Sequence, residues 1–579
     1  MRAPVAGLAR AVRAAAAGAA CALLAGCVGM PTEGPVEVPD VTAEVDDVPG
    51  ISFDPRPPRS GESPADIVAG FLEAMKATPI RTTVAREFLS TEAADAWVPE
   101  EQIITYNELG DPLGTIAVRI PMSDVNLYDE RGSWQRTLAE RPLDLRLVEE
   151  DGEWRIDRVP DALIVPDSWF DDWYQRVSLY FFDPTSQVLV PEPVFAPRGD
   201  QLASSLVRGL LTQPSGEAAD VARTYFPPGT EVASVPISGG IAEVALSGDP
   251  NAIDQDTADR MLAQLVETLR QEPRINAVQL SVGDRAFGFG GSATQTGLDV
   301  GRGYDPSDLA SRDLFALERG LVVSGTIGDF EPTLGPLGQE DYGIRSIGVD
   351  LPGSRVAGVS DDGGALVLAP MEQPDGEVAT VVSGAVDLAA PGWDYRGRAW
   401  VLDRGAGRAS VIVVEDGVAR ARTVPGVSGR TVTQLLVSRD GSRLVAVVRG
   451  ARADRVVRTR VRHDSDGAII GFTPVRTLAL PAGGTPRIRD VVWRTPTTVS
   501  VLSDTEELSE VRTLSVDGSP GEVTTGGTTR LRGPIRTLVS APVDAEAFAV
   551  AGRVVKSLTR PERAVPDLPP RLTSLTYVG

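Results

Sequence analysis

The sequence predicts a multidomain protein in which two α+β domains precede an all-β domain. The chain has 579 residues, enough for several domains, and 42% of them are hydrophobic, which is ample for packed cores. Residues 63–290 show stretches of helical period followed by stretches of period two. Residues 310–579 instead contain short apolar strands that recur at intervals. Together these three observations predict the class.

The N-terminus has the features of a secretory signal. Three arginines precede an uncharged apolar stretch at residues 14–24, which is too short to span a bilayer stably. Leu24-Ala25-Gly26-Cys27 resembles the bacterial lipobox, whose cysteine is acylated and becomes the first residue of the mature chain. We therefore predict a signal peptide at residues 1–26 and lipid attachment at Cys27. The protein would then be lipid-anchored on the extracytoplasmic face of the cell membrane. An ordinary signal peptide with a chance cysteine is the alternative.

The composition argues against several classes of function. A net charge of −24 disfavours nucleic acid as a partner and would steer basic partners toward the body. Only the acylated N-terminal end is suited to contact with a membrane. Cys21 lies in the signal peptide and Cys27 is the predicted lipid site, so the mature chain has no thiol for a disulfide or a metal. His463 is the one histidine, which nearly excludes a Ser-His-Asp triad or a histidine-built zinc centre. We predict no catalytic residue, no cofactor and no metal site.

Residues 27–62 are predicted to form a tether. The segment is rich in proline, glutamate and aspartate and shows little apolar periodicity, so it cannot bury enough surface to fold. Extended at about 3 Å per residue, it could hold the body up to ~100 Å from the membrane. Reach through the cell wall and a passive linker are both compatible with this pattern.

Residues 63–165 are predicted to form the first α+β domain. Ser63-Pro64 is a typical helix start, and the apolar residues that follow share one helical face. Two more short helices are expected before residue 98. Alternating strands follow, with a hairpin turn at Asp151-Gly152. The pattern resembles the NTF2-like fold, whose cone is an active-site pocket in some relatives. Because this cone would contain no histidine, we favour a scaffold or binding role.

Residues 175–290 are predicted to form the second α+β domain. A strand pair, a helix, Pro227-Pro228-Gly229-Thr230, a hairpin and a second helix precede a last strand at residues 277–282. This order resembles the GerMN domain, a module of sporulation and germination lipoproteins that serves assembly rather than catalysis. Residues 288–304 are expected to be a Gly-rich linker. A dinucleotide loop there is disfavoured, because no helical pattern follows it.

Residues 310–579 are predicted to form a β-propeller. Six apolar strands align as repeats, offset by 37 to 56 residues, and a turn and a second strand follow each of the complete ones. Such periods with several short strands per repeat are typical of propeller blades. We expect residues 573–578 to supply the inner strand of a blade whose outer strands come from around residues 317–328. That closure gives about six blades, with seven possible; an array of β-sandwiches is the alternative.

Two acidic motifs are candidates for a metal-binding or catalytic site. His463-Asp464-Ser465-Asp466-Gly467 could begin a calcium loop, but it lacks the closing glutamate of an EF-hand, and a hairpin turn is favoured. Asp167, Asp171 and Asp172 could supply a glycosidase carboxylate pair, but an acidic joint between domains is favoured.

A lipobox, a proline-rich tether, an NTF2-like unit, a GerMN-like domain and a propeller, in this order, resemble the LpqB family of actinobacterial lipoproteins. The resemblance implies that the protein binds the extracytoplasmic domain of a membrane sensor histidine kinase and modulates two-component signalling, with effects on cell-wall homeostasis and division. It carries over no catalytic residue, and Cys27 is the one functional position that transfers. The alternative is a cell-wall glycan-binding protein or an envelope hydrolase that uses the cone or the propeller channel.

Overall fold

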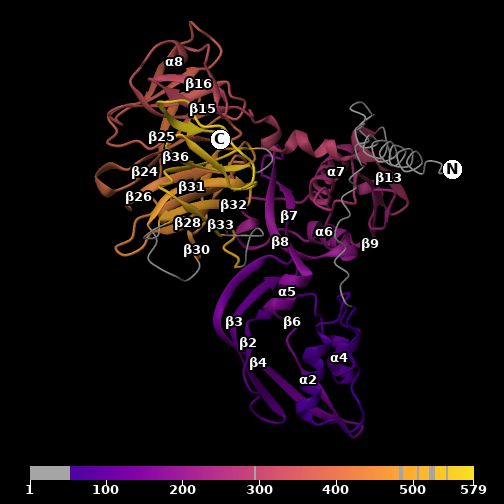
Figure 1. Ribbon diagram of the computed structural model, residues 1–579. Helices are drawn as coiled ribbons and strands as arrows, with labels where there is room; N and C mark the ends of the chain where they lie inside the picture. The colour runs from indigo at the N-terminus through magenta and orange to yellow at the C-terminus, as the bar shows by residue number, and fades with distance from the viewer. Residues whose placement is uncertain (1–51, 292–294, 481–486, 505–507, 521–527, 543–545) are drawn as a thin grey trace, which may run out of the picture. The chain divides into compact units, whose positions relative to one another are not determined.

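Three consecutive domains form the part of the chain that the computed structural model describes (Figure 1). These residues are 52–291, 295–480, 487–504, 508–520, 528–542 and 546–579. The predicted signal peptide, Cys27 and most of the predicted tether lie outside them. The predicted class, two α+β domains followed by an all-β propeller, is confirmed.

The first domain packs short helices against a mostly antiparallel sheet with the strand order β5-β4-β3-β1-β6, and β2 pairs with β3. Helices and sheet share one apolar core, in which Phe71, Ile104 and Leu147 are fully buried. The elements are α2 (Pro64–Ala74), α3 (Thr83–Arg86), α4 (Thr91–Ala96), β1 (Gln102–Tyr106), β2 (Glu108–Leu109), β3 (Ala117–Asp129), β4 (Trp134–Glu150), β5 (Glu153–Arg158) and β6 (Leu163–Pro166).

Local sequence signals explain where these elements begin and turn. Ser63 caps α2: its hydroxyl accepts from the Asp66 N–H, and the Asp66 carboxylate accepts from the Ser63 N–H, which forms a capping box. The turn between β4 and β5 has φ of 53° at Asp151 and 80° at Gly152, the left-handed values that a tight hairpin needs. Both predicted signals are confirmed.

The end of the predicted tether differs from the expectation. Phe53 forms a β-bridge with Thr78, so the chain is already paired to the first domain before residue 63. The Ser60 hydroxyl and the Gly61 N–H both donate to the Glu153 carboxylate, which anchors the segment next to the β4–β5 turn. Polar contacts with a neighbouring turn therefore order residues that have no apolar pattern of their own.

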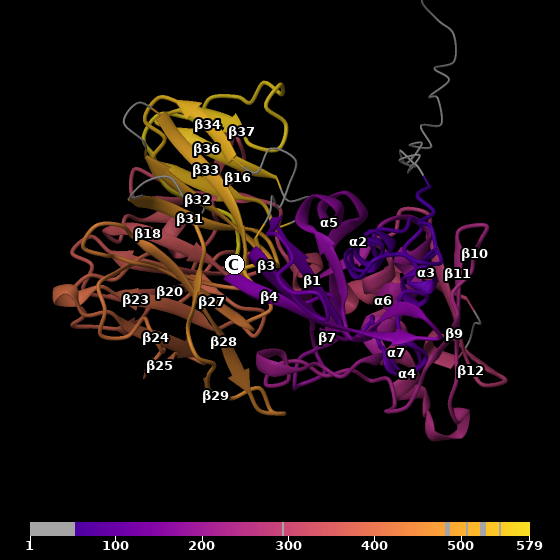
Figure 2. The ribbon, with the colours of Figure 1, turned by 90° about the horizontal axis from the view of Figure 1, so that it is seen from below.

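Helix α5 (Asp167–Trp173) connects the first domain to the second. In the second domain, α6 and α7 lie between the β7–β8 hairpin and the sheet built on β11 and β12, as the views of Figures 1 and 2 agree. All of these elements contribute to one apolar core. They are β7 (Tyr174–Phe182), β8 (Leu189–Pro197), α6 (Leu202–Leu211), β9 (Val232–Ser234), β10 (Ile237–Ser238), β11 (Ile241–Leu246), α7 (Gln255–Leu269), β12 (Ala277–Val282), β13 (Arg285–Phe287) and β14 (Thr296–Gly297).

The predicted Gly-rich linker is instead part of the second domain. β14 pairs antiparallel with β12, and two 3₁₀ helices follow it, η5 (Leu298–Tyr304) and η6 (Pro306–Leu309). Gly301 lies against α7, where an added Cβ would come within 2.7 Å of the Glu267 carboxylate. The glycine content that suggested flexibility thus permits a close approach to a helix.

The third domain is a propeller of six sheets within the described residues, as predicted. We number its blades 1 to 6, with strands from the centre outward. Blade 1 contains β38 (Leu572–Thr576), β15 (Leu314–Glu318), β16 (Leu321–Thr326) and β17 (Asp329–Pro332); blade 2 contains β18 (Ile344–Val349), β19 (Arg355–Ser360), β20 (Leu366–Pro370) and β21 (Ala379–Val382); blade 3 contains β22 (Gly392–Trp393), β23 (Ala399–Asp403), β24 (Ser410–Glu415) and β25 (Val418–Arg422); blade 4 contains β26 (Val432–Val437), β27 (Arg443–Val448), β28 (Arg455–His463), β29 (Ile469–Phe472) and β30 (Arg476–Leu478); blade 5 contains β31 (Ile488–Thr495), β32 (Thr498–Asp504), β33 (Leu508–Ser515) and β34 (Thr528–Arg532); blade 6 contains β35 (Thr537–Ser540), β36 (Ala547–Ala551) and β37 (Val554–Ser557). Helix α8 (Pro336–Gln339) lies between blades 1 and 2 in sequence.

The ring closes through β38, which pairs antiparallel with β15. The last strand of the chain is therefore the inner strand of the first blade, and the predicted closure is confirmed. The Ser574 hydroxyl also accepts from the Ile347 N–H at 2.8 Å, which ties β38 to the inner strand of blade 2.

Candidate functional site

The predicted lipid site, Cys27, lies outside the described residues, so its acylation stays a prediction. Among the helices that the structure describes, none is both long enough and apolar enough to cross a membrane.

The acidic motif at residues 463–467 is the predicted hairpin turn between β28 and β29. The Asp464 carboxylate accepts from the N–H groups of Asp466 (3.0 Å) and Ala468 (2.8 Å). Arg396 and Arg398, from blade 3, donate to the carbonyl oxygens of Asp466 and Gly467. The Asp464 carboxylate thus stabilises the turn from within, and the two guanidinium groups bind its backbone carbonyl oxygens.

The second acidic motif forms most of α5. The Asp167 carboxylate accepts from the Thr105 hydroxyl and from the Asn126 amide, so it fastens the helix to β1 and β3. Burial raises the pKa of Asp171, and the nearby charges of Asp167 and Asp172 raise it further. These carboxylates form the joint between the first two domains, as the sequence suggested.

A buried ion-pair cluster joins the second domain to blade 4. The Glu192 carboxylate on β8 accepts from Arg443 at 2.9 Å and from Arg460 at 2.6 Å, and all three side chains are at least 92% buried. Arg443 also donates to the Pro191 carbonyl at 2.5 Å. Burial alone would raise the pKa of Glu192, but Arg460 and Arg443 outweigh it and lower this pKa to about 2.

A second cluster lies beside the first. The Glu217 carboxylate accepts from Arg458 and, at 2.7 Å, from Arg476, both in blade 4. Tyr395 of blade 3 donates to Asp183 at 3.0 Å. Because these bonds attach strands of blade 4 and the turn at Tyr395 of blade 3 to the second domain, the two domains share a polar and largely buried interface.

The propeller encloses an axial channel with a volume of about 460 Å³. The inner strands of blades 2, 4, 5 and 6 line it, together with β38 and the segment before β22. Lining residues from these strands include Ile347, Pro391, Gln434, Asp490, Thr537 and Ser574. Asp490 is buried and accepts from Gln434, Thr537, and the N–H groups of Val491 and Leu538.

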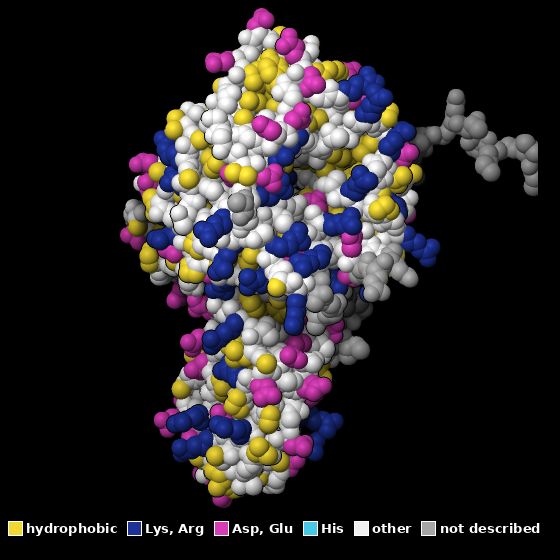
Figure 3. Space-filling view, turned by 90° about the vertical axis from the view of Figure 1, so that its left-hand side faces the viewer, with side chains coloured by type: hydrophobic (Ala, Val, Ile, Leu, Met, Phe, Trp, Pro, Cys, Tyr) yellow, Lys and Arg dark blue, Asp and Glu magenta, His cyan; other side chains and the backbone are white. Residues whose placement is uncertain are grey.

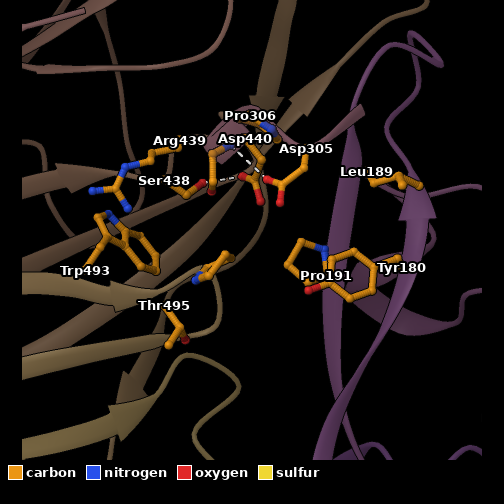
Figure 4. Close-up of a pocket in the computed structure, with 12 residues that line it drawn as sticks. Tyr180, Leu189, Pro191, Asp305, Pro306, Ser438, Arg439, Asp440, Trp493 and Thr495 are labelled. Atoms are coloured by element: carbon orange, nitrogen blue, oxygen red, sulfur yellow. Dashed lines mark hydrogen bonds between the residues drawn. The ribbon is translucent and has the colours of Figure 1, made fainter. Parts of the chain in front are cut away.

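Arg439 lies at the end of the channel that faces the second domain. It lines the channel and also a small pocket of about 30 Å³ between the propeller and the β7–β8 hairpin. Figure 4 shows its guanidinium beside the indole of Trp493, on the propeller side of the pocket, with Tyr180 and Pro191 opposite. Burial lowers the pKa of Arg439 to about 10, and the charge of Asp305 offsets part of this effect.

Sequence reasoning did not identify Arg439, Trp493 or Glu192. The repeat alignment contained part of the signal, because Trp493 occupies the repeat position that is Val437 in blade 4 and Val349 in blade 2. No local signal indicates that Glu192 meets arginines more than 250 positions away.

Comparisons with protein families cover most of the chain. The model of the lipoprotein LpqB N-terminal domain matches residues 57–171, and that of the LpqB β-propeller domain matches residues 320–561. The chain belongs to the LpqB lipoprotein family. Between these two segments, a model described as sporulation and spore germination matches residues 178–286, which agrees with the predicted GerMN-like domain.

Curated relatives of the LpqB family align along nearly the whole chain. Lipoprotein LpqB of Thermobifida fusca is 28% identical, with 91% of this chain and 93% of that protein aligned. Lipoprotein LpqB of Streptomyces coelicolor is 26% identical, with 86% and 87% aligned. These LpqB relatives are named as lipoproteins and not for an enzymatic activity, which implies a lipid-anchored membrane protein.

Solved structures resemble this LpqB chain over less than half its length. A chain of a nidogen/laminin complex covers 46% of it, and 98% of that chain is aligned, with 13% identity and a TM-score of 0.33. A putative TolB from Agrobacterium tumefaciens covers 43% of it, with 86% of that chain aligned, 17% identity and a TM-score of 0.29. At these scores neither likeness adds to the argument.

Proposed function

We propose that the protein is a membrane-anchored, extracytoplasmic lipoprotein that binds the extracytoplasmic domain of a sensor histidine kinase. By doing so it modulates two-component signalling and thereby cell-wall homeostasis and division. Membership of the LpqB family supports this proposal, and so does an architecture of binding modules joined by buried ion pairs. The lipid anchor at Cys27 and the tether would keep the body near membrane partners and raise its effective concentration.

The observation that carries the proposal is the free face of the propeller. In antiparallel blades, the loops that enter the inner strands and the loops between the second and third strands share one face. The interface with the second domain uses the opposite face, so the described part of the chain leaves the first face open to a partner. Figure 3 shows Lys and Arg side chains gathered across the middle and lower part of the propeller. Exposed arginines in or next to these loops include Arg408, Arg430, Arg452, Arg455 and Arg536.

This distribution differs from the expectation drawn from net charge. A chain with a net charge of −24 was expected to steer basic partners, yet the free face presents arginines to the solvent. A partner that docks here would present acidic side chains, because complementary charges set orientation and association rate.

The test is co-purification of the kinase with the full-length lipoprotein from solubilised membranes. Three forms are compared: the native protein, Arg452→Glu/Arg455→Glu on the free face, and Arg136→Glu/Arg285→Glu on the other two domains. The control pair is exposed and changes the net charge by the same amount. We expect the native protein and the control to recover the kinase, and the free-face variant to lose it at least tenfold.

Two results contradict the proposal. Equal recovery by all three forms would place the contact away from the propeller face. Failure to recover a kinase, together with binding or cleavage of purified cell-wall glycan, would favour the glycan-binding or hydrolase alternative.

A further inference from the structure

Asp490 is the one acidic side chain among the described residues that line the axial channel. Its carboxyl accepts hydrogen bonds from four donors of the channel wall, and burial raises its pKa. Near the outer mouth, Arg345 and Arg404 donate to the same Asp387 oxygen at 2.7 Å and 2.9 Å. Two cations thus share the Asp387 carboxylate at the entrance.

The inner end of the channel contains a cation without a carboxylate partner. Arg439 donates from Nε to the Val578 carbonyl at 3.2 Å, and none of the described carboxylates forms an ion pair with it. This side chain is half-buried, and the channel and the small pocket both reach it. A guanidinium that is partly withdrawn from water and has no ion-pair partner favours an anion beside it.

Neutral donors and acceptors without partners line the same cavity. Among the described residues, the Trp493 indole N–H, the Ser540 hydroxyl and the Gln434 amide oxygen are buried and have no hydrogen-bond partner. Trp493 lies beside Arg439 (Figure 4). Gln434 lies on β26, and Arg439 lies in the turn that follows this strand. Buried polar groups are normally paired, so these three atoms beside the cavity lack the partners that such groups usually have.

We propose that the axial channel binds a small anionic ligand, whose carboxylate or phosphate group pairs with Arg439 at the inner end. The planar guanidinium offers parallel N–H donors that match either group, and Trp493 supplies a further N–H donor beside it. The rest of the ligand extends along the apolar and hydroxyl-lined wall toward Gln434, whose free amide oxygen accepts from an N–H or O–H of the ligand. Arg345 and Arg404, which line the mouth, attract the anion into the channel. This inference does not depend on the kinase as partner.

The test uses the full-length lipoprotein in detergent and four probes: inorganic phosphate, glycerol phosphate, glutarate and neutral glycerol. Binding is followed by tryptophan fluorescence and by the shift in melting temperature, because a ligand of the folded state stabilises it. We expect saturable binding of at least one anionic probe and none of glycerol. Comparing the affinities of the two phosphate probes with that of glutarate distinguishes a phosphate ligand from a carboxylate ligand.

Variants decide whether Arg439 forms the site. Arg439→Gln removes the charge and should weaken binding at least tenfold, whereas Arg439→Lys keeps the charge and should retain part of it. Arg571→Gln is the matched control, because Arg571 is exposed and does not line the channel. Trp493→Phe, which removes the N–H but keeps an aromatic ring, tests the site if Arg439→Gln does not fold. Equal binding by the native protein and these variants, or no saturable binding of any anionic probe, would overturn the proposal.

Discussion

His463 is the one histidine of the chain, and its environment keeps it neutral. Burial lowers the pKa of its imidazole to about 4, and Arg398 contributes in the same direction. Between about pH 4 and 6.5 the unfolded chain therefore binds a proton that the folded protein rejects. Stability then rises with pH through this window and is lost as the pH falls, by about 3 kcal/mol for this group.

This pH dependence is open to a direct measurement. A single histidine gives a single imidazole signal in an NMR titration, and we expect its midpoint below pH 5. Chemical unfolding of the native protein and of His463→Gln between pH 4 and 7 isolates the contribution, because the other titrating groups are common to both. A midpoint near 6.5, or parallel stability profiles, would show that the histidine is solvated.

Strand β38 is the element on which closure of the propeller depends. Leu572 and Leu575 of this strand and Tyr577 and Val578 beyond it pack into the cores of blade 1 and its neighbours. Each such side chain contributes on the order of 1–3 kcal/mol, and its removal also exposes the edge of β15. We expect a chain ending at residue 571 to melt many degrees lower and to be cleaved readily within blade 1.

A peptide of residues 570–579 added in trans should restore protection to the shortened chain, because strand addition to an open edge reproduces the missing pairs. A scrambled peptide of the same composition is the control. Unchanged melting after truncation would mean that pairing within blades, rather than closure, holds the ring.

The elements could be predicted from the sequence because their signals are local. The Ser63 cap, the Asp151-Gly152 turn and the recurring inner strands all depend on residues close in sequence. The structure of the segment after residue 288 could not be predicted, because Gly301 in it packs closely against α7, a contact that exists only in the folded domain. Arg439 and the Glu192 cluster were also missed, because tertiary contacts alone give them their environment.

At the scale of the whole molecule, Glu192 and Glu217 couple the second domain to the propeller. Removing both carboxylates by Glu192→Ala/Glu217→Ala would leave Arg458 and Arg460 buried without their ion-pair partners, and Arg443 without its partner in the second domain. Breaking a buried pair in this way costs about 3–5 kcal/mol. We therefore expect calorimetry to show joint unfolding of the two domains in the native protein and two separate transitions in the variant.

Glu73→Ala is the matched control for this prediction. Glu73 pairs with Lys76 on the surface, with 53% of its side chain exposed, and such pairs contribute about 0–1 kcal/mol. Its calorimetric profile should match that of the native protein. A single unchanged transition in the double variant would contradict the coupling.

The pairing of β38 with β15 also has a consequence for the order of events during biosynthesis. Thr573 and Leu317 meet in the folded blade although 256 positions separate them. At a synthesis rate of about 5–20 residues per second, the first blade waits roughly 13–50 s for its inner strand. Through that interval the edge of β15 is an unpaired template that other chains can occupy. A factor that shields exposed strands would therefore act on this protein before its last residues are made.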